Sequence, residues 1–514
     1  MKDMRTAIID IGSNTVRLVM YRYSKDEGLR EFGNMKKVAR LRTYILPSGE
    51  MSEEGIQLLQ DLLQSFKQIL EDYNIKDIKI AATAAVRQAT NNTEIVQRMQ
   101  QQLGMTVDVL SEEEEAYFGF LAVVNSMSTP SAVTIDIGGG STEITLFKNK
   151  KLLKTHSFPF GTVSLKQNYV KNTIITEEEK KRLRSFLRRQ FMSLPWIVDV
   201  TLPIIGIGGS SRNIGQVYQQ KIDYPISDVH HFEMTKQNID TLKLELGSMS
   251  YEQLKNLDGL SADRADIIVL ALEAFAALME VVNSKHFQIS KKGLREGLII
   301  NRVAGSNVTA FDKYNVFNIN ARRIAFEYGR SEEEVMLLSN LAEQLYRDVC
   351  HLEVFHYNEA HLELIKRAAK LYAIGEYIEL DSASQHTFYL IANQAIPGIT
   401  QIERMKIALL ASYKNKEYFE RFVQPFSNWF SKEEQKDLRD LGAILKFVYG
   451  LNISKRNAVS RVTLEKTDEE IVCIVTTKRN AVAEEYQANR HKKHLERLFK
   501  CDLKIKFEVE GWNE

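Results

Sequence analysis

Two segments of the sequence place an aspartate, a glycine and small hydroxyl residues in the same order after an apolar run. The first reads Thr6-Ala-Ile-Ile-Asp10-Ile-Gly-Ser-Asn-Thr, and the second reads Ala132-Val-Thr-Ile-Asp136-Ile-Gly-Gly-Gly-Ser. They align without a gap. Glycine allows an anion to approach the backbone closely, and successive N–H groups in such a turn form an anion site. We therefore predict two phosphate-binding turns. Their candidate ligands are Asp10, Gly12, Ser13, Asn14, Thr15, Gly138, Gly139, Gly140, Ser141 and Thr142.

The aspartate that begins each turn indicates a cation. A carboxylate cannot lie against a phosphate unless a metal ion or a proton intervenes, so Asp10 and Asp136 indicate Mg²⁺, bound directly or through water. Glu143, on the strand after the second turn, could join them. The alternative is two β-hairpins with glycine turns and no site, and the shared register argues against it.

A third glycine-rich turn, Gly206 to Asn213, follows an apolar strand and is expected to open a helix. A helix N-terminus suits a phosphate or a nucleotide, which makes Gly208, Gly209 and Ser210 further candidate phosphate ligands. An ordinary strand–helix turn is the alternative. The chain holds no Gly-x-x-x-x-Gly-Lys-Ser/Thr segment, so a Walker A site is excluded.

Two further features could activate a nucleophile or bind phosphate. The glutamates Glu112 to Glu115 begin a helix, where acidic residues favour the helix dipole. One of them, if it lies beside the cleft, could instead orient a water molecule for attack on phosphorus. Arg87 follows a buried strand, from which it could bind a phosphate with two N–H groups or lie on the surface.

The elements that must position these residues alternate between strand and helix, which predicts an α/β class. Strand–turn–strand units are expected at 5–23 and 131–148, single strands at 75–83 and 105–110, and helices at 52–73 and 92–104. From about residue 311 the pattern becomes helical, at 324–353, 360–378 and 402–422. Strands return at 462–465, 471–476 and 503–509, around a helix at 484–499.

Composition limits the class of protein. The 514 residues are 44% apolar and 26% charged, which is ordinary for a globular protein, and the formal net charge is +1. No global field therefore favours nucleic acid or a membrane surface. Three scattered cysteines fit a reducing compartment. The most apolar run, 267–282, is broken by Glu273 and Glu280 and predicts a buried helix. We expect a cytoplasmic protein with no nucleic-acid or membrane partner.

The motifs together resemble a known family. The two glycine turns and Gly206-Ile-Gly-Gly-Ser resemble the actin-like ATPase superfold. More specifically, four segments resemble the exopolyphosphatase/guanosine pentaphosphate phosphohydrolase family: Asp10-Ile-Gly-Ser-Asn-Thr, Thr83-Ala-Ala-Val-Arg87-Gln-Ala, Ser111-Glu-Glu-Glu-Glu115-Ala and Asp136-Ile-Gly-Gly-Gly-Ser-Thr-Glu143. The segments Gly293-Leu-Arg295-Glu-Gly297 and Arg264-Ala-Asp266 also fit.

The resemblance implies roles for the site residues. Glu115, directly before an alanine, matches the catalytic base of the family, and Asp136 and Glu143 match its Mg²⁺-linked acids. Arg87 and the glycine turns match its phosphate ligands. The implied reaction is release of orthophosphate from the end of inorganic polyphosphate. Hydrolysis of guanosine pentaphosphate (pppGpp) by the same site is the nearest alternative, because the chemistry is identical.

The resemblance also implies an architecture and a homodimer. Two actin-like (ribonuclease H-like) lobes, 1–125 and 126–305, would enclose a cleft. An all-helical HD-like domain, 310–445, and a small α/β domain, 450–514, would follow. Where an HD domain has Leu-His-Asp-Ile-Gly, this chain has Leu371-Tyr372-Ala373-Ile374-Gly375, so we expect no metal site there.

Other functions on the same fold remain open. A kinase would need a nucleotide across the cleft and an acceptor, and the third glycine turn is compatible with one. A non-enzymatic sensor of polyphosphate or alarmone would lack a base, whereas Glu115 is present. An actin-like filament is disfavoured, because the additional C-terminal domains would obstruct stacking.

Overall fold

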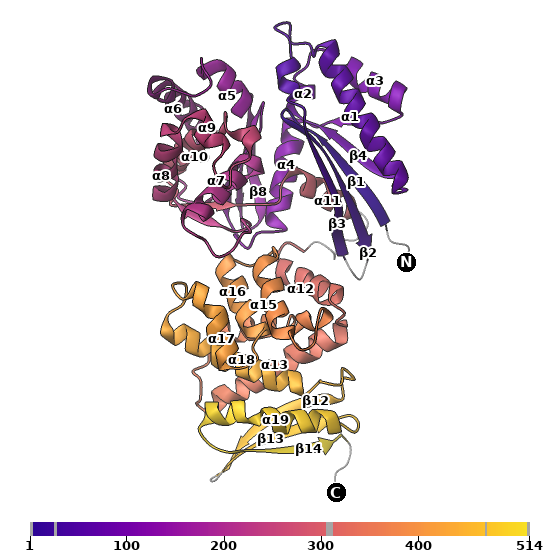
Figure 1. The fold of residues 1–514 in the computed structure, drawn as a ribbon, viewed down its shortest axis with the longest axis vertical. Helices are drawn as coiled ribbons and strands as arrows, with labels where there is room; N and C mark the ends of the chain where they lie inside the picture. The colour runs from indigo at the N-terminus through magenta and orange to yellow at the C-terminus, as the bar shows by residue number, and fades with distance from the viewer. Residues whose placement is uncertain (1–3, 25–27, 305–311, 468–469, 511–514) are drawn as a thin grey trace. The chain divides into compact units, whose positions relative to one another are not determined.

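The computed structural model describes residues 4–24, 28–304, 312–467 and 470–510 (Figure 1). The chain divides into two compact units, the first ending at Val316 and the second beginning at Phe317. Each unit is described by itself.

The first half of unit 1, lobe I, is built on a five-stranded sheet with the order β3-β2-β1-β4-β5. Strands β1, β2 and β3 are antiparallel, whereas β4 and β5 run parallel to β1. Helix α1 (Glu53–Asp72) begins at Ser52, whose hydroxyl accepts the Gly55 N–H as predicted for its N-cap. The strands are β1 Met4–Ile11, β2 Thr15–Ser24, β3 Gly28–Val38, β4 Asp77–Ala82 and β5 Val107–Val109, and the other helices are α2 Ala84–Arg87 and α3 Asn92–Leu103.

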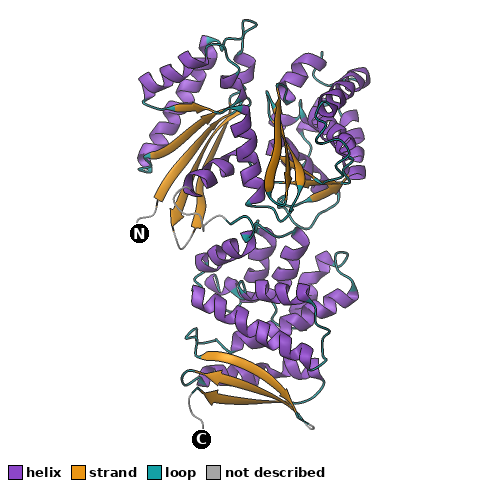
Figure 2. Ribbon diagram, turned by 180° about the vertical axis from the view of Figure 1, so that it is seen from behind, coloured by secondary structure: helices purple, strands orange, loops and turns teal. Residues whose placement is uncertain are grey.

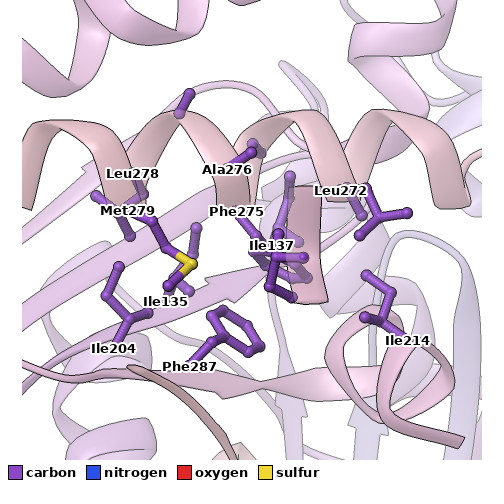
Figure 3. Packing of buried hydrophobic residues seen from close by; sticks show 14 of the residues in the cluster. Ile135, Ile137, Ile204, Ile214, Leu272, Phe275, Ala276, Leu278, Met279 and Phe287 are labelled. Atoms are coloured by element: carbon purple, nitrogen blue, oxygen red, sulfur yellow. The ribbon is translucent and has the colours of Figure 1, made fainter. Parts of the chain in front are cut away.

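The second half of unit 1, lobe II, has a six-stranded sheet with the order β10-β11-β9-β6-β7-β8. Helix α10 (Ile268–Val282) is buried on nearly all sides, which identifies a core helix and confirms the prediction for this run. Figure 3 shows its Phe275 and Met279 beside Ile135 and Phe287 of the sheet. The strands are β6 Ala132–Ile137, β7 Thr142–Lys148, β8 Lys151–Phe158, β9 Ile204–Ile207, β10 Glu233–Thr235 and β11 His286–Ile289. The other helices are α5 Thr162–Tyr169, α6 Glu177–Met192, α7 Gly208–Lys221, α8 Lys236–Ser248 and α9 Tyr251–Lys255.

The internal repeat seen in the sequence is present in both sheets. Asp10 pairs with Arg17 across β1 and β2, and Asp136 pairs with Glu143 across β6 and β7. In each lobe a third antiparallel strand, β3 or β8, extends the hairpin. The sequence analysis missed both third strands. They lie at sheet edges and are largely exposed, so they lack the regular alternation that identifies a half-buried strand.

Helices α4 (Glu112–Val124) and α11 (Leu294–Ala304) lie between the two sheets, as Figures 1 and 2 show. They cross in close backbone contact, because a Cβ on Gly297 would lie 1.9 Å from the Phe118 carbonyl oxygen. Helix α11 packs on lobe I through Leu298 and Val303. Helix α4 packs on lobe II through Phe120. The start of α4 therefore lies where the two lobes meet.

Unit 2 begins with seven α-helices among its described residues. They are α12 Val316–Glu327, α13 Glu332–His351, α14 Glu359–Ala369, α15 Ala383–Asn393, α16 Gln401–Ala411, α17 Lys416–Val423 and α18 Lys432–Gly450. The helix predicted at 324–353 is wrong, because it is interrupted at Gly329, whose φ is 75°. The helix predicted at 402–422 is likewise two helices, and Asn415 caps the second by accepting the Tyr418 N–H. The helix predicted at 360–378 ends at Ala369. Helices α15 and α18 were not predicted.

The end of unit 2 contains the predicted strands and helix: β12 Val459–Lys466, β13 Ile471–Thr477, α19 Val482–Phe499 and β14 Leu503–Val509. Strand β12 is an edge strand, and α13 covers it. Gln344 accepts the Val462 N–H at 3.1 Å, and Asp348 accepts the Leu464 N–H at 2.9 Å. Side chains of a helix thus bind the N–H groups that an uncovered edge would expose.

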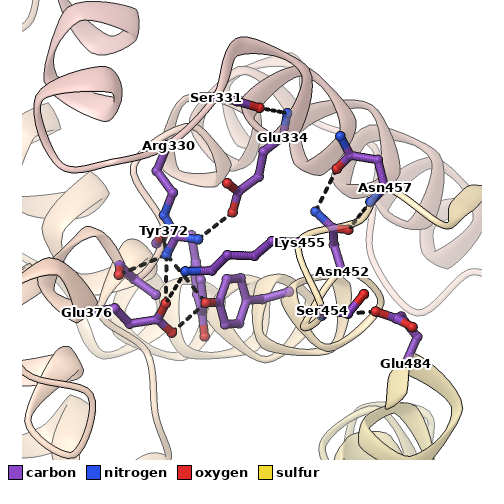
Figure 4. Close-up of polar contacts among 12 residues, drawn as sticks. Arg330, Ser331, Glu334, Tyr372, Glu376, Asn452, Ser454, Lys455, Asn457 and Glu484 are labelled. Atoms are coloured by element: carbon purple, nitrogen blue, oxygen red, sulfur yellow. Dashed lines mark hydrogen bonds and ion pairs between the residues drawn. The ribbon is translucent and has the colours of Figure 1, made fainter. Parts of the chain in front are cut away.

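A buried arginine, Arg330, bonds to the segment around Tyr372 to Glu376, where an HD domain would hold its metal ligands (Figure 4). Arg330 is 5% exposed, pairs with Glu334, and donates to Glu376 at 3.1 Å and to the Ala373 carbonyl at 3.0 Å. The phenol ring of Tyr449 lies 5.4 Å from the guanidinium. Within the described ranges, no group of three or more His, Cys, Asp or Glu side chains is arranged to hold a metal ion. The same ranges contain no helix long and apolar enough to cross a membrane.

Candidate active site

A cavity of about 160 Å³ lies between the lobes of unit 1, at the ends of the two repeated hairpins. Fourteen of the residues singled out in the sequence line it: Asp10, Gly12, Ser13, Asn14, Thr15, Glu115, Asp136, Gly138, Gly139, Gly140, Ser141, Glu143, Gly208 and Gly209.

The two glycine turns touch each other at one side of the cavity. A Cβ on Gly139 would lie 3.0 Å from the Ser13 Cβ, and one on Gly140 would lie 3.1 Å from the Ser13 Oγ. Side chains at these positions would push the turns apart. Asn14 lines the cavity beside them, and its amide nitrogen is buried without a hydrogen-bond partner among the described residues. A ligand that accepts a hydrogen bond from Asn14 would satisfy this donor.

Three of the predicted site residues do not line the cavity. The Thr142 hydroxyl donates to the Phe160 carbonyl at 2.6 Å. The Ser210 hydroxyl accepts from Arg264 at 3.2 Å. Arg87 donates from one terminal nitrogen to the Leu110 carbonyl and to Glu115 Oε2, both at 2.9 Å. The structure therefore places Arg87 against the carboxylate of Glu115 and not on the cavity wall.

Four carboxylates line the cavity, and burial raises their pKa values. Burial is the largest cause for Glu115, whose pKa rises to about 7 although Arg87 opposes the shift. Burial also raises the pKa of Asp136 to about 6, with Arg212 opposing and Asp10 adding to the shift. The pKa of Glu143 is raised well above its ordinary value by burial and by the charges of Glu115 and Asp136.

The position of Glu115 fits a general base. It lies in the first turn of α4, which Ser111 and Glu114 cap by a reciprocal pair of hydrogen bonds. This cap fixes where the helix begins and so where Glu115 faces the cavity. A carboxyl group with a pKa near 7 can gain and lose a proton at neutral pH, which general base catalysis requires.

Five basic residues line the same cavity: Arg17, Lys36, Arg212, Arg264 and Arg295. Arg295 lies 3.9 Å from an Asp10 oxygen. Arg264 lies against the N-terminus of α7, because a Cβ on Gly209 would lie 2.1 Å from it. Both the guanidinium and a helix N-terminus attract anions, so this wall suits phosphoryl oxygens.

The sequence analysis did not assign these cations to the site, although most had a signal. Arg17 is the register partner of Asp10, and Arg212 lies in the third glycine-rich turn. Arg264 and Arg295 lie in segments that fit the family resemblance. Lys36 had no local signal, because it lies on the unpredicted edge strand β3.

Asp136 and Glu143 supply oxygen ligands of the kind that a Mg²⁺ ion would need. Asp136 and Glu143 pair across β6 and β7, and repulsion from the charge of Asp136 helps to raise the pKa of Glu143. A cation between them would relieve this repulsion. Mg²⁺ commonly binds one or two carboxylates and completes its shell with water and phosphate oxygens.

Comparison with known proteins places the chain in a family. Residues 23–305 match the model of the Ppx/GppA phosphatase family, and residues 323–501 match the model of Ppx/GppA phosphatase, domain III. A guanosine-5'-triphosphate,3'-diphosphate pyrophosphatase of Vibrio parahaemolyticus is 26% identical over 417 residues, 79% of each chain. The Vibrio cholerae protein of that name is 27% identical over 411 residues, which cover 77% of this chain and 78% of its own.

Solved structures of the same family are similar to this chain. A Ppx/GppA family member of Aquifex aeolicus is 28% identical, with a TM-score of 0.53, and covers 60% of this chain and 99% of its own. An exopolyphosphatase of Cytophaga hutchinsonii is 20% identical, with a TM-score of 0.54, covers 59% of this chain and 98% of its own, and shows the fold alone. The resemblance and the fold class inferred from the sequence are confirmed. Because the first family model alone spans residues 23–305 of 514, the chain belongs to the Ppx/GppA phosphatase family, whose members hydrolyse phosphoanhydride bonds.

Proposed function

We propose that the protein is a Mg²⁺-dependent exopolyphosphatase, which releases orthophosphate from the end of inorganic polyphosphate. One observation carries the proposal: Glu115, with a pKa of about 7, faces the same cavity as both glycine turns and five basic side chains. The turns and the cations suit a terminal phosphoryl group, and Glu115 suits activation of water beside it.

In the proposed reaction, the terminal phosphoryl group lies between the turns at 12–15 and 138–141. Glu115 accepts a proton from a water molecule as its oxygen attacks phosphorus, and the bond to the bridging oxygen breaks. Asp136 and Glu143 would hold Mg²⁺, which neutralises charge on the phosphoryl oxygens when bound. Arg295 and Arg264 stabilise the charge that develops on the shortened polyphosphate.

Arg87 positions the base in this scheme. Its ion pair with Glu115 fixes the carboxylate and opposes the rise in its pKa. Without that pair, burial alone would leave Glu115 protonated over more of the neutral range and unable to accept a proton.

Hydrolysis of pppGpp is the second candidate, and the names of the Vibrio relatives favour it. A 5'-triphosphate presents the same terminal phosphoryl group as polyphosphate. Among the residues that the structure describes, no aromatic side chain lines the cavity. The described lining therefore offers no ring on which a guanine base could stack, and it contacts only the phosphoryl end of either substrate. The substrates would then be distinguished by what lies beyond the cavity.

Phosphate release separates these functions. The protein is assayed on long polyphosphate and on pppGpp, each with and without Mg²⁺ and with no added nucleotide. We expect Mg²⁺-dependent release from polyphosphate with the higher kcat/KM. A higher value on pppGpp would favour the second candidate, and dependence on an added acceptor would indicate a kinase. Cytoplasmic location and a homodimer remain predictions, which cell fractionation and sedimentation would test.

A further inference from the structure

A row of three side chains crosses lobe I from the base of the cavity outward. Asp10 pairs with Arg17 across β1 and β2, and Arg17 pairs with Lys36 across β2 and β3. Directly opposed residues on antiparallel strands project from the same face of a sheet. All three line the cavity. Lys36, on the edge strand, is the outermost of the row.

Lys36 also reaches across to lobe II. Its Nζ lies 2.9 Å from Asp263 Oδ2, and the two side chains are 31% and 20% exposed. Asp263 directly precedes Arg264, which lines the cavity. Close by, Asp266 of lobe II binds Lys166 at 2.7 Å and lies 3.9 Å from Arg40 of lobe I. Ion pairs between the lobes therefore lie at the rim of the phosphate cavity.

The partly exposed pair can exchange partners at little cost. An ion pair with this much solvent contact contributes modestly to stability. Lysine is a compact charge on a flexible stem with three donors, so it can turn from a carboxylate to a phosphoryl oxygen without a change in the backbone. A polyphosphate whose end occupies the cavity would bring several such oxygens to the rim.

We propose that Lys36 is a substrate ligand for the phosphoryl groups behind the terminal one, and that Asp263 is the partner it leaves when such a substrate binds. The inference rests on the proposed function, because it assumes a phosphoanhydride chain with its end in the cavity. It makes Lys36 a residue that favours substrates with several consecutive phosphoryl groups, and it gives Asp263 the role of holding Lys36 at the rim of the free protein.

Binding of tripolyphosphate, followed by titration calorimetry, tests this proposal without turnover when Mg²⁺ is left out. The variants are Lys36→Ala, Asp263→Ala and the exchange Lys36→Asp with Asp263→Lys. Lys79→Ala is the control, since Lys79 lies in the same sheet, is also 31% exposed and binds Asp108 at 2.8 Å, away from the cavity. Orthophosphate, which lacks the additional phosphoryl groups, is the second probe.

Lys36→Ala should weaken tripolyphosphate binding about tenfold, in keeping with one charge-assisted contact in partial solvent. It should leave orthophosphate binding unchanged. The control variant Lys79→Ala should bind tripolyphosphate as tightly as the wild-type protein does. Asp263→Ala should not weaken it, because Lys36 stays in place. The exchanged pair should bind no better than Lys36→Ala, since a carboxylate then stands at the ligand position.

If Lys36 and Asp263 only hold the lobes together, Asp263→Ala would match Lys36→Ala, and the exchanged pair would restore binding. That result would overturn the proposal. A wild-type protein that binds tripolyphosphate but releases no phosphate from it with Mg²⁺ would instead refute the proposed function, so the two failures are distinguishable.

Discussion

Glu115 and Arg87 form an ion pair with an N–O distance of 2.9 Å, in which both side chains are largely buried. The pair joins two segments that lie 28 residues apart in the sequence. Arg87 lowers the pKa of the proposed base, against the effect of burial, although Arg87 does not itself line the cavity.

Replacing Arg87 should therefore alter the pH dependence of the reaction. In Arg87→Met the lowering influence on the Glu115 pKa is lost, so the base is protonated up to a higher pH. The acidic limb of the kcat/KM profile should move to higher pH, by about one unit for each 1.4 kcal/mol of lost interaction. Arg98→Met, which removes an arginine that binds Glu53 on the same lobe, is the control. An unmoved acidic limb would show that Arg87 does not tune the base.

Mg²⁺ affinity should fall in acid. The pKa of Asp136 is about 6 and that of Glu143 is higher than usual, and a metal ion binds the deprotonated groups. Binding should therefore weaken as pH falls through about 6 and should release protons near neutrality. Calorimetry in buffers of different ionisation enthalpy measures both effects. Glu143→Gln should weaken binding and Glu113→Gln, on the exposed start of α4, should not. Equal affinity at about pH 8 and about pH 5 would refute this assignment.

The crossing of α4 and α11 should not tolerate a side chain at Gly297. A Cβ there would lie 1.9 Å from a backbone oxygen that cannot rotate away, so Gly297→Ala should lower the free energy of unfolding of unit 1 by about 3 kcal/mol or more. Gly119→Ala is the matched control, because its Cβ would meet only Ile207 at an ordinary 3.6 Å. It should be neutral, or stabilising by up to about 1 kcal/mol. Chemical denaturation measures both, and equal effects would contradict the crossing.

Arg330 should be essential to unit 2. Removing it in Arg330→Met leaves the buried carboxylate of Glu334 and the partly buried one of Glu376 without this partner, and breaking a buried pair costs about 3–5 kcal/mol. The same change at Arg347, an exposed partner of Glu343 on α13, should cost less than about 1 kcal/mol. Thermal unfolding of the full chain, in which each unit can melt separately, would show the difference. Similar losses from both variants would contradict the role given to Arg330.

Short sequence segments were sufficient to predict the two glycine turns, but they were not sufficient to predict which basic side chains line the cavity. Asp10, Gly12 and Ser13 are neighbours in the chain, so their types alone indicated an anion-binding turn, and both turns line the cavity. Arg87 was identified as a candidate, but whether it faced phosphate or Glu115 depends on how α2 packs. Lys36 reaches the cavity only because three strands lie side by side, which no short segment encodes.

The helical half shows the same limit. The apolar spacing in 324–353 continues across Gly329, so periodicity alone favoured one helix where the positive φ of that glycine ends α12. The strands β12 to β14 were found because β-branched residues alternate there and turns separate them. The edge strands β3 and β8 were missed because they are largely exposed and so lack the alternation of a half-buried strand.

The most direct test of the account is phosphate release by Glu115→Gln. Glutamine keeps the size of the side chain and removes its ability to accept a proton. We predict that kcat on long polyphosphate falls by about 10²- to 10⁴-fold, while tripolyphosphate binding stays within about threefold of wild type, a difference of less than about 1 kcal/mol. Near wild-type phosphate release from this variant would contradict the assignment of Glu115 as the base, and with it the proposed mechanism.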